Sequence, residues 1–246
     1  MSTRPDAAGP AGTIELDRVS VALGGSPVLR DVSVRLEQRR IAVIGANGSG
    51  KSTFARLLNG LVMPSSGRIT VHGLDVGRDA KQVRERVGFV FTNPDAQILM
   101  PTVAEDVALS LRGSGRPRAE VAARVTAALE QYGLGHRADQ PAYSLSGGQK
   151  QLLALVSVLI REPAVVVADE PTTLLDLGNA RRIGDLLLRE TAAQVVLVTH
   201  DLELAARCDV AVRFAEGRLT EVGQPSDVIA RYRAEFAEAS HPDGSP

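Results

Sequence analysis

Short runs of apolar residues alternate with helix-like segments along most of the chain. The apolar runs are Ile41–Ile44, Gly88–Phe91, Val165–Ala168 and Val195–Val198. A strand that is apolar at nearly every position is typical of a parallel sheet whose two faces are both covered by helices. The pattern therefore predicts an α/β protein built around a parallel core sheet.

Helical spacing of apolar residues marks the segments between these runs. We expect helices over Ser52–Leu61, Arg118–Leu134, Gly147–Ile160 and Asn179–Leu188, because their apolar residues recur every three or four positions. The helices around 93–160 predict a mostly helical subdomain. The arginine-rich stretch 112–118 is glycine-rich and polar, and we interpret it as a solvated loop, with contact to lipid headgroups as a lesser alternative.

The N-terminal part has a different pattern. Ile14–Leu23 and Val28–Leu36 are rich in strand formers, and the second alternates apolar and polar residues. Alternation with a period of two is typical of strands with one buried face. We expect an antiparallel β-layer here, preceded by a disordered lead-in over residues 1–12 and with a flexible tail over residues 236–246.

Composition narrows the class of protein. The 246 residues are 44% hydrophobic and carry a formal net charge of -1, so the chain lacks the basic footprint of a nucleic-acid binder and no nucleic-acid partner is expected. The single cysteine, Cys208, excludes an internal disulfide and fits a reducing cytoplasm. The longest strongly apolar stretch, Leu152–Ile160, is much shorter than the roughly 20 residues that span a bilayer.

A phosphate-binding loop follows the first apolar run. Residues 45–52 fit the pattern G-x-x-x-x-G-K-[ST] between a predicted strand and a predicted helix, which is the context that this motif requires. Lys51 is expected to reach the β- and γ-phosphates of ATP, and Ser52 to ligate Mg²⁺. The nucleotide-binding candidates of this loop are Gly45, Asn47, Gly48, Ser49, Gly50, Lys51, Ser52 and Thr53. A glycine-rich turn arising by chance would leave Lys51 at the end of a buried strand without a role.

Two carboxylates end the apolar run Val165–Ala168. Asp169 and Glu170 lie at the carboxyl end of a predicted strand, where open α/β sheets bind their ligands. We expect Asp169 in the magnesium shell and Glu170 as the group that polarises the attacking water. An Asp-Glu pair after an apolar strand would be a weak signal on its own.

The segment Leu145–Gln149 distinguishes between the families that share a phosphate-binding loop. Its residues Ser146, Gly147, Gly148 and Gln149 form a second glycine-rich helix start and thus a second anion site. With this segment the chain resembles the ABC ATPase family. The resemblance implies that two subunits pack head to tail, so that this segment of one closes over the γ-phosphate held by the other.

The resemblance also assigns roles to two further residues. His200, which follows the run Val195–Val198, is similar to the switch histidine that contacts the γ-phosphate. Asp176 resembles the acidic residue of the loop that crosses the dimer interface, and it also fits the N-cap of the Asn179 helix. The resemblance covers about Ile14 to Asp227, which implies one ATPase domain over residues 13–235.

Two positions depart from the family pattern. Leu23 stands where the family usually has an aromatic residue that stacks on adenine. Thr92 stands where the family has a glutamine that touches magnesium and the attacking water. A hydroxyl can ligate magnesium but reaches less far, so either the geometry shifts or Gln97 compensates.

The segment around Asn93–Gln97 and Pro101–Ala108 resembles the ATPases of energy-coupling factor importers, and Arg40–Leu61 with Phe91–Val107 is most similar to the biotin-uptake ATPase. This resemblance implies a second ATPase subunit, a transmembrane coupling protein and a substrate-binding membrane protein as partners. It places the chain at the cytoplasmic face of the membrane. Cobalt, nickel or another vitamin is the alternative cargo.

Three other functions compete with a transport ATPase. A small-molecule kinase would leave Leu145–Gln149 and His200 without a role, and a DNA-repair ABC protein would need a coiled-coil insertion or zinc modules. A regulatory module that binds ATP with little turnover would fit Leu23 and Thr92, but Glu170 and His200 favour an enzyme.

Overall fold

The computed structural model describes residues 12–239, which form two compact units. Within the described residues, the first unit contains residues 12–84 and 194–239, and the second contains Glu85–Ala193. Most of the expected lead-in and residues 240–246 of the expected tail lie outside the described residues. Residues 236–239 of that tail belong to a helix. The sequence-based domain boundaries, including the helical part at 93–160, stay predictions.

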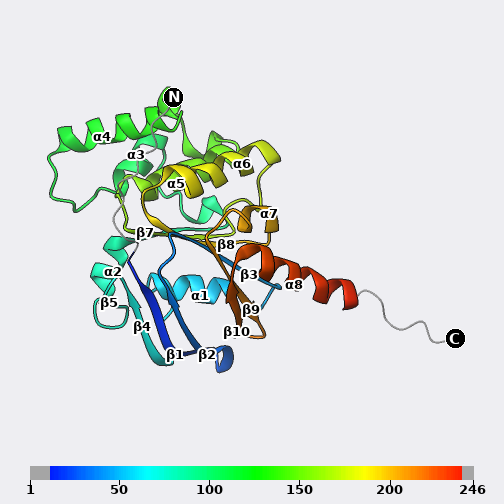
Figure 1. Ribbon diagram of the computed structural model, residues 1–246. Helices are drawn as coiled ribbons and strands as arrows, with labels where there is room; N and C mark the ends of the chain where they lie inside the picture. The colour runs from blue at the N-terminus through cyan, green and yellow to red at the C-terminus, as the bar shows by residue number, and fades with distance from the viewer. Residues whose placement is uncertain (1–11, 240–246) are drawn as a thin grey trace, which may run out of the picture. The chain divides into compact units, whose positions relative to one another are not determined.

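The first unit holds two sheets (Figure 1). An antiparallel sheet has the strand order β2-β1-β4-β5, in which β1 covers Ile14–Leu23, β2 Ser26–Leu36, β4 Ser66–Val71 and β5 Leu74–Asp75. Buried and exposed residues alternate through much of β1, so one face of this layer packs on the core while the other is exposed. This is the antiparallel β-layer that the alternating pattern predicted.

The core strands of the first unit run in the order β10-β9-β3-β8. They cover Arg40–Gly45 (β3), Gln194–Val198 (β8), Val210–Ala215 (β9) and Arg218–Gly223 (β10). β3 lies parallel to β8 and β9, whereas β10 is antiparallel to β9. Every residue of β3 and β8 is buried, as expected for strands covered on both faces. The predicted parallel core is confirmed here, with an antiparallel strand at its edge.

Four helices complete the described part of this unit: α1 (Lys51–Leu58), α2 (Ala80–Arg86, which reaches the unit boundary), α7 (Leu202–Ala205) and α8 (Pro225–Ala239). α8 lies beside β9 and β10 (Figure 1). The buried Arg213 of β9 pairs with Glu235 of α8 and lies over the Tyr232 ring, 5.2 Å from its centroid. These contacts fix the C-terminal helix to the strand next to β3.

The second unit combines a parallel strand pair with helices. β6 (Val87–Val90) pairs with β7 (Val165–Asp169) in parallel register. The helices are α3 (Val103–Leu109), α4 (Arg118–Gln131), α5 (Gly147–Leu159) and α6 (Leu177–Asp185), and α6 continues as a π-helical turn over Leu186–Glu190. Short 3-10 turns cover Pro94–Ala96, Gly135–Arg137 and Ala142–Ser144. α3 packs against both α4 and α5.

The predicted helices exist, but their ends differ. α1 ends at Leu58 and not at Leu61, because Gly60 adopts a positive φ of 72° just after it. α4 ends at Gln131, before Gly133 with φ 75°. α6 begins two residues earlier than expected, because the Asp176 side chain caps it. No helix within residues 12–239 is long and apolar enough to cross a membrane.

Candidate functional site

The phosphate loop connects β3 to α1 in the first unit. Gly45 has φ 144°, and a Cβ there would lie 2.2 Å from the backbone oxygen of Phe214. Gly50 has φ 104°, and a Cβ there would lie 2.6 Å from a methyl carbon of Leu29. A side chain at Gly45 would clash with the backbone of β9, and one at Gly50 would be strained by the positive φ, so the glycines let the loop lie directly on β9 and β2.

The polar groups of this loop suit an anionic ligand. Lys51, the first residue of α1, is buried, and its Nζ donates hydrogen bonds to the backbone oxygens of Gly45 (2.7 Å) and Ala46 (2.8 Å). Ser49 Oγ is buried and has no hydrogen-bond partner within the described chain. A buried hydroxyl without a partner is costly unless a ligand binds it. The loop thus holds a cation and an unsatisfied hydroxyl beside a helix N-terminus.

His200 follows β8, the strand that pairs with β3, and β3 leads into the phosphate loop. β8 runs parallel to β3 with Val198 opposite Val43, and Thr199 N donates to Val43 O at 3.1 Å. Thr199 is fully buried, whereas His200 is exposed after the end of the strand. The carboxyl ends of adjacent parallel strands meet at one edge of a sheet. The structure therefore brings His200 and the phosphate loop to the same edge.

Three predicted residues come together in the second unit. β6 and β7 are adjacent, with Val90 opposite Ala168, and Thr92 Oγ1 donates a 2.8 Å hydrogen bond to the backbone oxygen of Asp169. Asp169 ends β7 and is buried. Glu170 follows with φ 53° and accepts a hydrogen bond of 2.9 Å from Thr173 Oγ1. A left-handed backbone at a non-glycine residue is strained, and such strain is common at functional sites.

Gln97 is tied to the backbone of the same unit. Its Oε1 accepts from Phe91 N at 3.2 Å, and its Nε2 donates to Ala154 O at 3.0 Å. Both ends of the amide therefore hold the end of β6 against α5. This arrangement gives Gln97 a structural role and leaves Thr92 as our candidate at the position where the family has a glutamine.

Ser146 begins the second anion-binding candidate. Ser146 caps α5: its Oγ accepts from Gln149 N, and Gln149 Oε1 accepts from Ser146 N at 3.0 Å. This reciprocal capping box fixes the helix start. A Cβ on Gly148 would lie 2.4 Å from the Asn179 side chain, whereas the space around Gly147 is open. Gly148 is thus the contact point between the first turns of α5 and α6.

Asp176 holds the other side of that contact. Its carboxylate accepts hydrogen bonds from Asn179 N (2.9 Å) and Asn179 Nδ2 (2.7 Å). These bonds lower the pKa of the Asp176 carboxyl, the backbone bond from Asn179 contributing most. The structure therefore supports the expected N-cap and adds Asn179, which no sequence signal had marked.

Cys208 takes no part in this chemistry. It is buried, and burial raises the pKa of its thiol to about 12. A thiol with such a pKa stays protonated and unreactive at neutral pH.

The sequence missed an exposed apolar surface on the second unit. Leu99 is 72% exposed and Tyr143 is 80% exposed. Both line a cavity of about 300 Å³ together with Asp95, Ile98, Met100, Pro101 and Ala142. Large exposed apolar side chains that share a cavity mark an interaction surface, and only the structure shows that they are exposed together.

Comparison with known proteins defines the class. A family model described as ABC transporter matches residues 29–173, more than half of the chain. A protein of Deinococcus radiodurans, named provisionally as an ABC transporter ATP-binding protein, is 49% identical over 89% of this chain and 97% of its own length. The chain belongs to the ABC transporter family, as an ATP-binding protein of that family, and it is an ATPase.

Some relatives carry names that specify what they transport. The biotin transport ATP-binding protein of Rhizobium etli is 41% identical over 89% of this chain and 97% of its own length. The nickel import ATP-binding protein of Rhodobacter capsulatus is 40% identical over 88% and 91%. The solved structure of cbiO1 from Clostridium perfringens, part of the ABC transporter complex cbiONQ, has a TM-score of 0.79, 31% identity and coverage of 92% and 94%. The expected P-loop ABC fold is confirmed.

Proposed function

We propose that this protein is the ATP-hydrolysing motor subunit of an energy-coupling factor importer, that it works as a homodimer, and that its cargo is biotin. The observation that carries this proposal is the pair of glycine-rich helix starts. One is the loop around Lys51 in the first unit, and the other is the capped start of α5 at Ser146 in the second. Each presents backbone N–H groups to an anion.

Two anion sites in one chain favour a head-to-tail dimer. In such a dimer the Lys51 loop of one subunit holds the phosphates, and Ser146, Gly147 and Gly148 of the other close over the γ-phosphate. Asp176 holds Asn179 against Gly148. The loop that contains Asp176, which we expect to cross the dimer interface, is therefore linked to the segment Ser146–Gly148 that closes over the γ-phosphate. Two identical chains would then form two competent sites.

We assign each candidate residue a separate role in ATP binding or hydrolysis. Lys51, now bonded to two backbone oxygens, would exchange these partners for phosphate oxygens when ATP binds. Glu170 would take the proton of the attacking water, and His200 would contact the γ-phosphate. Thr92 keeps oxygen lone pairs available after donating to Asp169 O.

Magnesium fits the oxygen donors of these residues. Ser52 and Thr92 offer hydroxyl oxygens and Asp169 a carboxylate, and magnesium prefers such hard oxygen ligands together with several waters. Bound there, it would neutralise charge on the β- and γ-phosphates. Ser52 and Asp169 are our first choices to hold it.

The exposed surface around Leu99 and Tyr143 suits a membrane partner. Asp106 Oδ1 accepts from Leu99 N (2.8 Å) and Met100 N (3.1 Å), so the segment is held rigidly on α3. Lys150 of α5 pairs with Asp95 at 2.7 Å, which links the surface to the helix that Ser146 caps. A transmembrane coupling protein that binds this surface would sense the nucleotide through α5.

The identity of the cargo is the most specific part of the proposal. The biotin and nickel relatives differ by only one percentage point in identity, so identity alone does not select between vitamin and metal. We favour biotin because of the likeness of Arg40–Leu61 and Phe91–Val107 to the biotin-uptake ATPase. A separate substrate-binding membrane protein would select the cargo, so no residue of this chain needs to contact it.

Uptake in cells carrying the whole gene cluster tests the cargo. We expect labelled biotin to accumulate, and Lys51→Ala to abolish the accumulation. If cobalt or nickel accumulates in place of biotin and depends on Lys51, the cargo is a metal ion and the motor function stands. If no cargo depends on Lys51 while the chain binds ATP, the protein is a regulatory ATP-binding module.

A further inference from the structure

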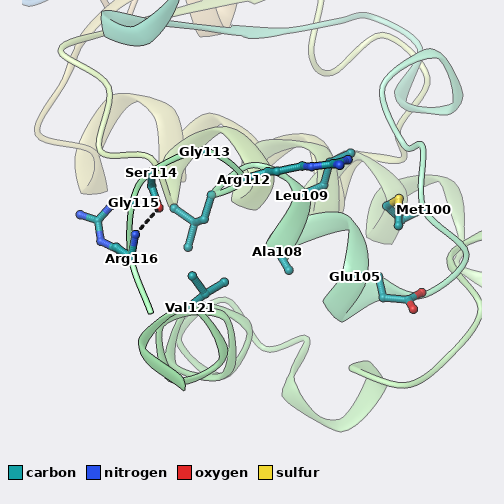
Figure 2. Close-up of a pocket in the computed structure, with 11 residues that line it drawn as sticks. Met100, Glu105, Ala108, Leu109, Arg112, Gly113, Ser114, Gly115, Arg116 and Val121 are labelled. Atoms are coloured by element: carbon teal, nitrogen blue, oxygen red, sulfur yellow. Dashed lines mark hydrogen bonds between the residues drawn. The ribbon is translucent and has the colours of Figure 1, made fainter. Parts of the chain in front are cut away.

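The second unit contains a pocket that the proposed ATPase cycle does not use. It has a volume of about 400 Å³ and lies between α3, α4 and the loop that joins them. Its wall carries five apolar side chains, Met100, Ala108, Leu109, Leu111 and Val121. In Figure 2 Val121 projects from α4 on the opposite side of the pocket from Arg112. Small-molecule sites have volumes from about 300 Å³ upward and mostly apolar walls.

The charged side chains at the rim are not equivalent. Glu105 is engaged by Thr102, whose N and Oγ1 donate to its Oε2 at 3.1 and 2.8 Å. Arg116 pairs with Glu120 at 3.0 Å. In contrast, the Arg112 side chain makes no ion pair or hydrogen bond with any residue of the described chain, and Figure 2 shows it in an extended conformation. The pocket therefore combines an apolar wall with one arginine, Arg112, that has no side-chain partner in the described chain, and with one carboxylate, Glu105, whose Oε2 is occupied by hydrogen bonds from Thr102.

We propose that this pocket binds a small alkyl carboxylate, with its chain on the apolar wall and its headgroup on Arg112. A guanidinium matches the planar, two-oxygen geometry of a carboxylate. One unpaired arginine balances one negative charge, and the volume suits a single short chain. A two-chain phospholipid would need more apolar surface than this pocket offers.

The pocket also adjoins the surface that we assign to the membrane partner. Met100 lines both cavities, and its backbone N–H is held by Asp106 of α3. A bound carboxylate would therefore contact the segment that couples nucleotide state to the membrane subunits. The inference about binding does not depend on that function, because it rests only on the pocket.

Titration of the purified chain with butanoate, hexanoate and octanoate, each matched by the neutral 1-alkanol of equal length, tests the proposal. Calorimetry at low ionic strength should show affinity rising by up to about fourfold per added methylene. Octanoate should bind about threefold or more tightly than 1-octanol, a modest factor because Arg112 is exposed and its ion pair is screened.

Two pairs of variants separate the pocket from general surface charge. Arg112→Gln should remove the advantage of octanoate over 1-octanol, whereas Arg118→Gln, which removes the same charge outside the pocket, should keep it. Val121→Phe should fill the pocket and weaken both ligands, and Ala122→Phe on the exposed side of α4 should not. All four variants should keep the circular dichroism spectrum of the wild type.

Three results would overturn the proposal. Equal affinities for octanoate and 1-octanol would show an apolar pocket without charge recognition. An equal loss in Arg118→Gln would show a general charge effect. Arg112-dependent binding to vesicles of anionic phospholipid, without binding of octanoate, would assign the surface to a lipid membrane.

Discussion

Lys51 is held by the loop that it is expected to serve. Its two hydrogen bonds to Gly45 O and Ala46 O keep the ammonium group at the start of α1. The sequence predicted the phosphate-binding role of Lys51 and its neighbours, because the motif is contiguous along the chain. It could not predict the unsatisfied Ser49 hydroxyl, which depends on how the loop lies on neighbouring strands.

Lys51→Ala should weaken Mg-ATP binding roughly tenfold or more, since a charge-assisted hydrogen bond to phosphate is worth about 1.5–3 kcal/mol. Titration calorimetry measures the change, and thermal unfolding checks that the chain still folds. Lys81→Ala removes an exposed lysine of α2 and should bind as the wild type. Unchanged ATP affinity in the Lys51 variant would refute its assignment.

Glu170→Gln should bind ATP but lose at least about a hundredfold in turnover, because a glutamine cannot take a proton from water. The glutamine oxygen can still accept the bond from Thr173 Oγ1, so the local structure should persist. Size-exclusion chromatography with ATP should show a trapped dimer. Glu130→Gln, at an exposed position of α4, is the matched control. Wild-type turnover, or a chain that stays monomeric with ATP, would contradict the role of Glu170.

Thr92→Gln should hold or raise the ATPase rate, because a longer amide reaches further toward the metal and the water than a hydroxyl that donates to Asp169 O. Phosphate release measures the effect. If turnover disappears while ATP binding persists, Thr92 is an adapted functional residue and the expectation of a deficit is wrong.

Strong local signals decided which elements could be predicted. Continuous apolar runs gave β3, β6, β7 and β8 to within a residue or two at each end, because burial on both faces leaves few polar positions. α3 was not identified as a helix, although Thr102 and Glu105 form a capping box at its start, a signal that is readable in the sequence. Strands β4, β5, β9 and β10 and helices α2, α7 and α8 were missed as well.

Side-chain contacts between particular elements could not be predicted. The first turns of α5 and α6 meet at Gly148 and Asn179, residues that are far apart in sequence and carry no joint motif. The same is true of Arg213, which is buried in β9 and paired with Glu235 of α8. Such pairs depend on the fold and not on local propensity.

Gly148→Ala should lower the melting temperature, because its new Cβ would lie 2.4 Å from Asn179, which Asp176 holds in place. Gly147→Ala is the control: open space surrounds that position, and alanine favours a helix over glycine by about 1 kcal/mol. Adding Asn179→Ala to Gly148→Ala should restore part of the loss. Equal melting temperatures for the two single variants would show that the contact is not close.

The whole molecule offers a candidate nucleotide loop on one unit, and on the other a candidate second anion site and the exposed apolar surface that we propose for a membrane partner. Its membership in the ABC transporter family explains why both are present in one chain. The sequence indicated the family through its motifs, but the surface at Leu99 and Tyr143 emerged only from their exposure in the structure.

Phosphate release by the purified chain, measured alone and with the membrane subunits of its gene cluster reconstituted in vesicles, tests most directly whether this protein is a transport motor. We predict that the chain hydrolyses Mg-ATP and that the membrane subunits change the rate of hydrolysis. Glu170→Gln should abolish hydrolysis. Leu99→Ser and Tyr143→Ser should hydrolyse ATP at a rate that no longer responds to the membrane subunits. Hydrolysis that never responds to the membrane subunits, or none in any state, would contradict the account.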